Sequence, residues 1–148
     1  MFEKIMVCLD GSKLAEQILP YATEQARRFC SKLVLLQVWS MSIAEITKTT
    51  SNSFELKQQT LNDEAKNYLE KVAAPLKEQG LNVICVTLQG IAEDVIIGYA
   101  QDETIDLIAM TTHGRSGLGR TIFGSVADQV LRKSGLPILL IKPKDVLV

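Results

Sequence analysis

"IDLIAMTTHGRSGLGRTIFGSVADQVLRKSGLPILLIK", residues 105–142, is the stretch that decides the fold class of this chain. It begins with an apolar run, continues through a glycine-rich segment and a helical pattern, and closes with a second apolar run at 136–142. Both runs are apolar throughout rather than alternating, as is typical of strands buried on both faces of a parallel sheet. Val126 and Val130 give the helix that begins at Ser125 an apolar face. The stretch therefore predicts a strand, a loop, a helix and a strand.

The same alternation of strand and helix extends over the rest of the chain. It predicts an α/β fold in which a parallel sheet carries helices on both faces, within one domain spanning residues 1–148. The predicted strands are 4–10, 32–38, 82–88, 105–111 and 136–142, and the predicted helices are 13–30, 55–79, 91–103 and the one that begins at Ser125.

Three interruptions of this pattern carry structural predictions. Pro20 lies inside the first helical pattern and removes a backbone donor there, so we expect a kink. Residues 40–54 are rich in Ser and Thr and have little periodicity, which predicts a long loop and a candidate lid. The long helix after this loop should be disturbed near Pro75 and should end at Gly80.

Composition excludes several classes of protein. The 148 residues are 47% hydrophobic with a formal net charge of −1, which favours a packed fold and lacks the basic excess of a nucleic-acid binder. No apolar window is long enough to cross a bilayer, so we expect no membrane partner. Three cysteines without metal-ligand spacing, and no secretory signal, predict reduced thiols and a cytoplasmic location.

The glycines point to a binding site. Four of the nine glycines lie between Gly114 and Gly124, in the loop that leads into the last helix. Ligands of open α/β sheets bind beyond the carboxyl ends of the strands, and a second polar loop, Asp10-Gly11-Ser12, follows the first strand. If the two strands are neighbours, both loops face one crevice, where bare backbone and a helix N-terminus favour a phosphate.

Simpler interpretations stay open for the same residues. Asp10 could form a turn or cap the first helix, and Ser125 with Asp128 resembles a capping box. The loop matches neither GxxxxGK[ST] nor GxGxxG. His113, the only histidine, has no Ser/Asp arrangement that would indicate a catalytic triad, and no cluster of His, Cys and carboxylates indicates a protein-held metal.

Three segments resemble the universal stress protein family: "MVCLDGS" at 6–12, "LLQV" at 35–38 and the block from 110 to 142. The nucleotide-binding branch of that family has a glycine, two residues, a glycine, nine residues, a glycine and then Ser or Thr. Gly114, Gly124 and Ser125 match this pattern, whereas Thr111 stands in place of its first glycine.

This resemblance implies a Rossmann-like, open, twisted, five-stranded sheet of order 3-2-1-4-5, in which the first and fourth strands are neighbours. It also implies that the crevice binds ATP, which Mg²⁺ can accompany. Asp10 would meet the ribose, the Val38 backbone would receive the adenine, and Met110 and Thr111 would line base and sugar, the Thr111 hydroxyl being available to the sugar. The phosphates would be held by Gly114, Gly124, Ser125 and Val126.

The expected function is an ATP-binding regulatory module of the stress response, with no residue assigned to catalysis. A slow ATPase and a nucleotide-free dimeric interaction protein are the alternatives. The resemblance implies a homodimer that pairs through the edge strand from Leu136 to Lys142, beginning after Pro137, which lacks an N–H. The sequence does not identify a protein partner, and we expect no nucleic-acid partner.

Overall fold

The computed structural model describes residues 1–48, 50–114 and 124–144 of the chain. Its strands form one parallel sheet of order β3-β2-β1-β4-β5, which confirms the predicted fold class and strand order. All five lie within three residues of their predicted bounds at either end. The strands are β1 (Lys4–Leu9), β2 (Lys32–Trp39), β3 (Asn82–Gln89), β4 (Leu107–Thr111) and β5 (Ile138–Ile141).

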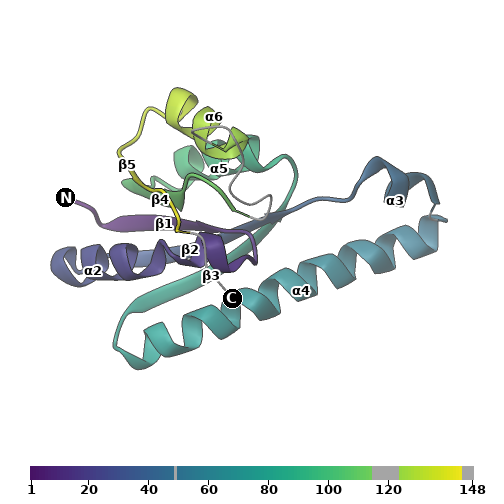
Figure 1. Cartoon of the computed structure of the whole chain (residues 1–148). Helices are drawn as coiled ribbons and strands as arrows, with labels where there is room; N and C mark the ends of the chain where they lie inside the picture. Colours follow the sequence, from purple (N-terminus) through teal and green to yellow (C-terminus); the bar gives the residue numbers. More distant parts are fainter. Residues whose placement is uncertain (49, 115–123, 145–148) are drawn as a thin grey trace.

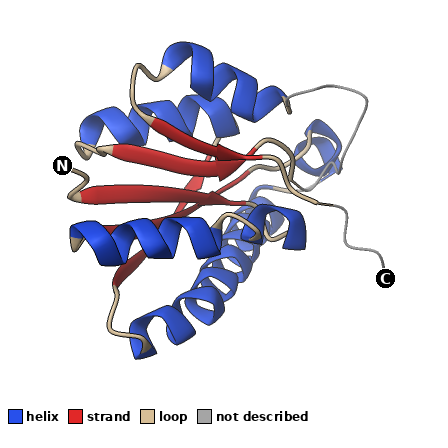
Figure 2. Cartoon of the chain, turned by 60° about the vertical axis from the view of Figure 1, so that its left-hand side comes forward, coloured by secondary structure: helices blue, strands red, loops and turns tan. Residues whose placement is uncertain are grey.

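Helices cover both faces of the sheet (Figure 2). One face carries α1 (Lys13–Glu16), α2 (Leu19–Phe29) and α4 (Ser51–Glu78), and the other carries α5 (Ala92–Asp102) and α6 (Ser125–Lys133). The remaining helix, α3 (Ile43–Lys48), lies beyond the end of the sheet beside the first turns of α4 (Figure 1). The layers thus leave the carboxyl edge of the strands to loops and helix termini.

The alternation of strand side chains divides the core into two clusters. In β1, Ile5 and Val7 pack with the α2 and α4 side, whereas Met6 packs with the α5 and α6 side. In β2, Leu35 packs with the α2 and α4 side and Leu36 packs with the α5 and α6 side. Burial of these side chains on both faces stabilises the sheet by roughly 1.5–3 kcal/mol for each large one, and it explains why the strands are apolar throughout.

The predicted kink at Pro20 is a complete break between two helices. Ser12 caps α1 by accepting a hydrogen bond from the Ala15 N–H at 3.1 Å, and α2 begins at Leu19. Pro20 lies in the first turn of α2, where a missing N–H loses no helical hydrogen bond. The single helix predicted over 13–30 was therefore wrong, because the proline begins a helix rather than bending one.

The predicted loop at 40–54 was also wrong over most of its length. Ser42 and Glu45 cap α3 reciprocally: the Glu45 N–H donates to Ser42 Oγ at 3.1 Å, and the Ser42 N–H donates to Glu45 Oε2 at 2.8 Å. This is a capping box, and it starts a helix in a Ser/Thr-rich segment. The chain then enters α4 at Ser51. A lid role for the segment stays a prediction.

The end of α4 follows the sequence pattern more closely. Pro75 lies inside the helix near its C-terminal end, and the helix stops at Glu78. Gly80 follows with a φ of +86°, a conformation that favours glycine. Trp39 Nε1 and Thr87 Oγ1 both donate to Asn62 Oδ1, at 3.2 and 2.8 Å, and so attach α4 to β2 and β3.

Candidate functional site

The first half of the site is the turn after β1. Asp10 Oδ1 accepts hydrogen bonds from the Ser12 N–H at 2.9 Å and from Ser12 Oγ at 2.5 Å. Gly11, between them, has a φ of +87°, which an L side chain rarely adopts. The structure thus confirms a turn at Asp10, while Ser12 rather than Asp10 caps α1. The turn holds the Asp10 carboxylate at the carboxyl edge of the sheet.

The second half is the end of β4, which lies beside β1 as predicted, with Ile5 in register with Leu107. Thr111 Oγ1 donates to the His113 carbonyl at 2.6 Å, and Thr112 Oγ1 lies 2.8 Å from His113 Nδ1. All three residues are buried. The Thr111 hydroxyl therefore already donates its proton within the protein, so its predicted contact with the sugar is limited to its oxygen lone pairs.

Gly114 and Gly124 both occupy positions where a side chain would collide. A Cβ added at Gly114 would lie 2.0 Å from Asp10 Oδ2, and one added at Gly124 would lie 2.3 Å from the Thr112 carbonyl oxygen. The Gly124 N–H donates to that same carbonyl at 2.8 Å. Gly124 has a φ of −67°, so close approach of backbone, not an unusual dihedral, requires glycine there.

The capping box predicted for Ser125 and Asp128 is not found at the N-terminus of α6. Gly124 is the N-cap, Ser125 is the first helical residue, and no side chain in the described part of the chain caps this helix. Asp128 instead pairs with Arg132, with oxygens at 3.0 and 3.1 Å from Arg132 Nε. The first intrahelical bond runs from the Asp128 N–H to the Gly124 carbonyl, so the N–H groups at 125–127 have no partner within the helix.

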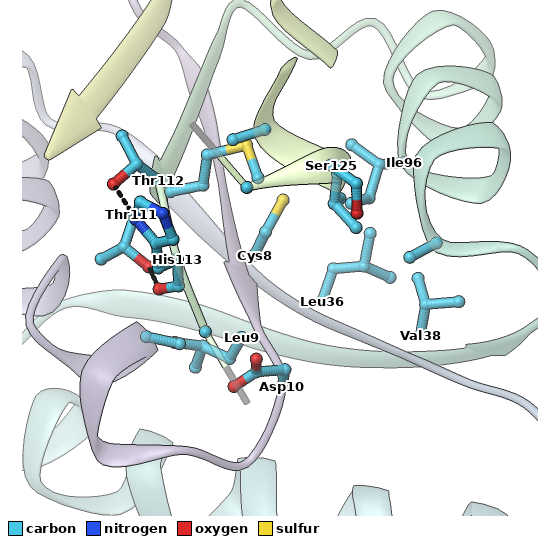
Figure 3. Close-up of a pocket in the computed structure, with 17 residues that line it drawn as sticks. Cys8, Leu9, Asp10, Leu36, Val38, Ile96, Thr111, Thr112, His113 and Ser125 are labelled. Atoms are coloured by element: carbon cyan, nitrogen blue, oxygen red, sulfur yellow. Dashed lines mark hydrogen bonds between the residues drawn. The ribbon is translucent and has the colours of Figure 1, made fainter. Parts of the chain in front are cut away.

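These elements surround a pocket of about 250 Å³. Figure 3 shows Leu36, Val38 and Ile96 on one side of it and the Thr111–His113 turn on the other. Such a pocket, mostly apolar with a few polar groups, is typical of a small-molecule site. All eight residues predicted to bind a cofactor line it: Asp10, Val38, Met110, Thr111, Gly114, Gly124, Ser125 and Val126.

Sequence reasoning missed several residues of the lining. Cys8 and Leu36 form part of the apolar floor, and burial raises the pKa of the Cys8 thiol to about 12, so it stays neutral. Leu36 could have been found, because alternate residues of a strand share a face and Val38 was already placed there. Thr112 and His113 also line the pocket; the sequence indicated no catalytic triad at His113 and did not assign either residue to the site.

Other predictions about this loop lie outside the described residues. Arg115 and Arg120, which the sequence leaves open as phosphate-neutralising or as solvated loop residues, fall within 115–123, as do Gly117 and Gly119. Within the described ranges, no three His, Cys, Asp or Glu side chains converge as metal ligands. None of the helices described combines the length and hydrophobicity that crossing a bilayer requires.

The sequence profile of the universal stress protein family matches residues 1–142, nearly the entire chain. The chain belongs to the universal stress protein family. A related universal stress protein, MJ0531 of Methanocaldococcus jannaschii, is 29% identical over 142 residues, which cover 96% of this chain and 83% of that protein. Universal stress protein MJ0577 of the same organism has a solved structure that matches with a TM-score of 0.85 and 32% identity, covering 99% of each chain.

Two more distant universal stress proteins share the fold with this one. A family member from Arabidopsis thaliana, solved with AMP bound, is 19% identical with a TM-score of 0.69, covering 95% of this chain and 92% of its own. A universal stress protein solved in complex with cAMP is 17% identical with a TM-score of 0.64, covering 97% of this chain and 98% of its own.

Proposed function

We propose that this universal stress protein binds ATP between β1 and β4 and serves the stress response as a nucleotide-dependent regulatory module. The observation that carries the proposal is the convergence on one pocket of the Asp10 carboxylate, an apolar floor and the N-terminus of α6, which no side chain in the described ranges caps. The two distant family members solved with AMP and with cAMP support the choice of an adenine nucleotide.

The base would lie against the apolar side of the pocket. Two backbone hydrogen bonds show which way the groups of β2 point. The Lys32 N–H donates to the Glu3 carbonyl, on the β1 side of the strand, and the Trp39 carbonyl accepts from the Gly90 N–H, on the β3 side. Because strand backbone groups alternate in direction, the Val38 carbonyl faces the β1 side. Pairing with β1 ends at Leu9, opposite Gln37, so this carbonyl extends past the paired region and suits an adenine amino group.

The phosphates would lie at the start of α6. The N–H groups at 125–127 and the helix dipole favour negative charge, and neither needs a specific side chain. Asp10 would accept from a ribose hydroxyl on the opposite side. Since no three metal-ligating side chains converge in the described ranges, Mg²⁺ would come with the phosphates and neutralise part of their charge.

The test is nucleotide extraction from the purified protein followed by thermal unfolding with Mg-ATP. ATP at about a hundred times its Kd should stabilise the fold by roughly 2.7 kcal/mol, on the order of 5–10 °C for a chain of this size. AMP and cAMP, run in parallel, report how much of the affinity resides in the adenosine. Absence of both a co-purified nucleotide and a shift at millimolar Mg-ATP contradicts the proposal.

We also propose a homodimer that pairs through β5. The sheet order leaves this strand at an edge with β4 as its neighbour, and its four residues, Ile138–Ile141, are apolar and half-buried. An unpaired apolar edge invites a second copy. Sedimentation at micromolar concentration should show a dimer, and Leu140→Lys should shift it toward monomer. A wild-type protein that sediments only as monomer contradicts this.

A further inference from the structure

The two edges of the sheet differ in how well they are protected against pairing with another strand. β5, at one edge, has four residues and follows Pro137. β3, at the other edge, has eight residues, Asn82–Gln89, with no proline and no charged side chain among them. Its register with β2 is regular over its whole length. Natural sheets usually protect a long edge with charge, proline or a bulge, and the β3 edge has none of these.

The backbone groups that β3 directs outward can be assigned by residue. The Gly90 N–H donates to the Trp39 carbonyl at 3.0 Å, so residue 90 faces β2. Because strand backbone groups alternate in direction, the N–H and C=O groups of Val83, Cys85 and Thr87 point away from β2. No strand in the described ranges pairs with them. These groups therefore form one half of a hydrogen-bonding ladder.

One face of the sheet beside this edge is apolar. Ile84, Val86 and Leu88 point to the α5 and α6 side of the sheet and are only partly buried. The α5 helix packs mainly against β2 and α6, so it leaves this margin of the sheet partly uncovered. A strand added beside β3 would bury more of these three side chains if its own side chains on that face were apolar.

The α4 side of the same edge is polar. Thr87 Oγ1 donates to Asn62 of α4 at 2.8 Å. Burial raises the pKa of the Cys85 thiol, while the charge of Lys77 lowers it and that of Glu70 raises it, so both charges lie near the strand. Since side chains alternate between the faces of a strand, the segment that fits this edge alternates apolar and polar residues.

The position of α4 opposes a second copy of the chain as the partner. The helix runs along β3 and packs more on β3 than on β2 (Figure 1). In an antiparallel two-fold pair of β3 strands, both α4 helices lie on one face and about 5 Å apart, the spacing of strands. Packed helices need about 8–10 Å. Two copies held apart in this way would not bury the roughly 1,200 Å² of a specific interface.

We propose that the β3 edge binds an extended segment of a partner protein, which adds a strand to the sheet. Its backbone would pair with the groups of Val83, Cys85 and Thr87, and its apolar side chains would lie on the face that carries Val86. An isolated segment brings no helix of its own, so α4 does not obstruct it. The paired part contains no proline, because each second residue must donate an N–H. The ATP proposal does not enter this argument.

The test measures the fluorescence anisotropy of a labelled peptide, in which threonine and valine alternate between terminal lysines, during titration with the protein. Saturable binding is expected. Cys85→Pro removes an outward N–H and no bond to β2, and it should weaken binding about tenfold or more. Val86→Thr keeps the side-chain shape and should weaken binding about threefold. Leu140→Lys is the matched control: it changes the β5 edge, and the affinity should not change.

Amide hydrogen exchange, followed by NMR, locates the peptide on the sheet independently of any variant. With peptide in excess, the outward amides of Cys85 and Thr87 should exchange about tenfold more slowly or less. The amides of Ile84 and Val86 already face β2 and should change little. This alternation distinguishes pairing along the edge from a contact with the face of the sheet.

Four outcomes overturn the proposal. One is a dissociation constant weaker than about 1 mM. Another is equal affinity for a peptide of the same composition whose valines are contiguous, which indicates non-specific attraction. The third is unchanged affinity of a folded Cys85→Pro protein, checked by circular dichroism, or unchanged exchange at Thr87 if that variant does not fold. The last is a Leu140→Lys protein that sediments as a dimer unless peptide is added, which assigns the edge to a second copy.

Discussion

Two cavities meet at the carboxyl edge of the sheet: the pocket between β1 and β4, and a second pocket of about 460 Å³ between β2 and α4, which shares Asp10 and Val38 with the first. The first combines backbone N–H groups at the start of α6 with an apolar floor, whereas the second is lined by Gln37 and Glu64 and by the rings of Trp39 and Tyr68. The difference arises within one strand, because consecutive β2 side chains alternate between the faces of the sheet. A single sheet edge can thus present two cavities of different composition.

The largest expected effect is the loss of the first pocket through Gly124→Ala. The new Cβ would lie 2.3 Å from the Thr112 carbonyl, and backbone cannot rotate away as a side chain can. The first turn of α6 must shift, and losing two charge-assisted hydrogen bonds to phosphate should weaken ATP binding about a hundredfold. The measurement is calorimetric titration with Mg-ATP.

Gly98→Ala is the matched control for that variant. Gly98 lies within α5, and an added Cβ there has no heavy atom within 4 Å among the described residues. Its ATP affinity should equal that of the wild type. If Gly124→Ala binds ATP as tightly as Gly98→Ala, the start of α6 does not hold the phosphates.

The next effect tests whether the floor of the first pocket is dry. Burial raises the Cys8 pKa from 9.0 to about 12, so the folded state keeps the proton while the unfolded state loses it above pH 9. The stability linked to Cys8 is therefore fully present below pH 9 and falls as pH rises toward 12. Between pH 8 and pH 10 the free energy of unfolding should fall by about 1.4 kcal/mol through this group.

Urea unfolding of the wild type and of Cys8→Ala at both pH values measures this term. The variant loses packing at each pH, so the comparison is between the two pH-dependent differences. Cys30→Ala, at an exposed position, is the control and should decline like the wild type. An equally steep decline in Cys8→Ala would mean that the thiol is solvated and that the floor is wetter than its burial indicates.

A smaller effect concerns the Thr111 hydroxyl. Thr111→Val keeps the shape of the side chain and removes its hydrogen bond to the His113 carbonyl. The free energy of unfolding should fall by about 1 kcal/mol, with a change in ATP affinity of less than threefold. A large loss of affinity at unchanged stability would reverse this assignment and give the hydroxyl to the ligand. Denaturant unfolding and Mg-ATP titration of the same sample distinguish the two.

The smallest expected effect is a gain in stability. Gln37→Leu replaces a buried acceptor that has no partner among the described residues with an apolar side chain, and the protein should become more stable by roughly 0.5–1 kcal/mol. Thermal unfolding without ligand measures it. The opposite sign, a destabilisation, would show that the Gln37 amide is already satisfied.

The sheet and the first pocket could be predicted from the sequence because their signals are local. Buried parallel strands are apolar throughout, and Asp10-Gly11-Ser12 and Gly124-Ser125 follow directly after strands or before a helix. The strand order itself came from the family resemblance. The capping box at Ser42 and Glu45 was also readable, as Ser-x-x-Glu, but the surrounding Ser and Thr residues obscured it.

The second pocket could not be predicted. Its lining combines Gln37 of β2 with Glu64 and Tyr68 of α4, and no sequence spacing brings these residues together. A lone glutamine within an apolar run gives no indication of whether its amide is paired. The failed single helix over 13–30 has a similar cause, since Pro20 is compatible with a kink or a helix start, and only the packing of α1 and α2 decides between them.

The contact between Gly114 and Asp10 limits the order in which this protein can accumulate substitutions. A side chain at 114 would meet Asp10 Oδ2, so Asp10 must either rotate away from Ser12 or be replaced by a shorter residue. Shortening Asp10 first, however, removes the acceptor of both Ser12 hydrogen bonds and loosens the turn before α1. A substitution at position 10 alone or at position 114 alone is thus unfavourable. The two positions are epistatic, and this separates sequences that carry both Asp10 and Gly114 from sequences that carry neither.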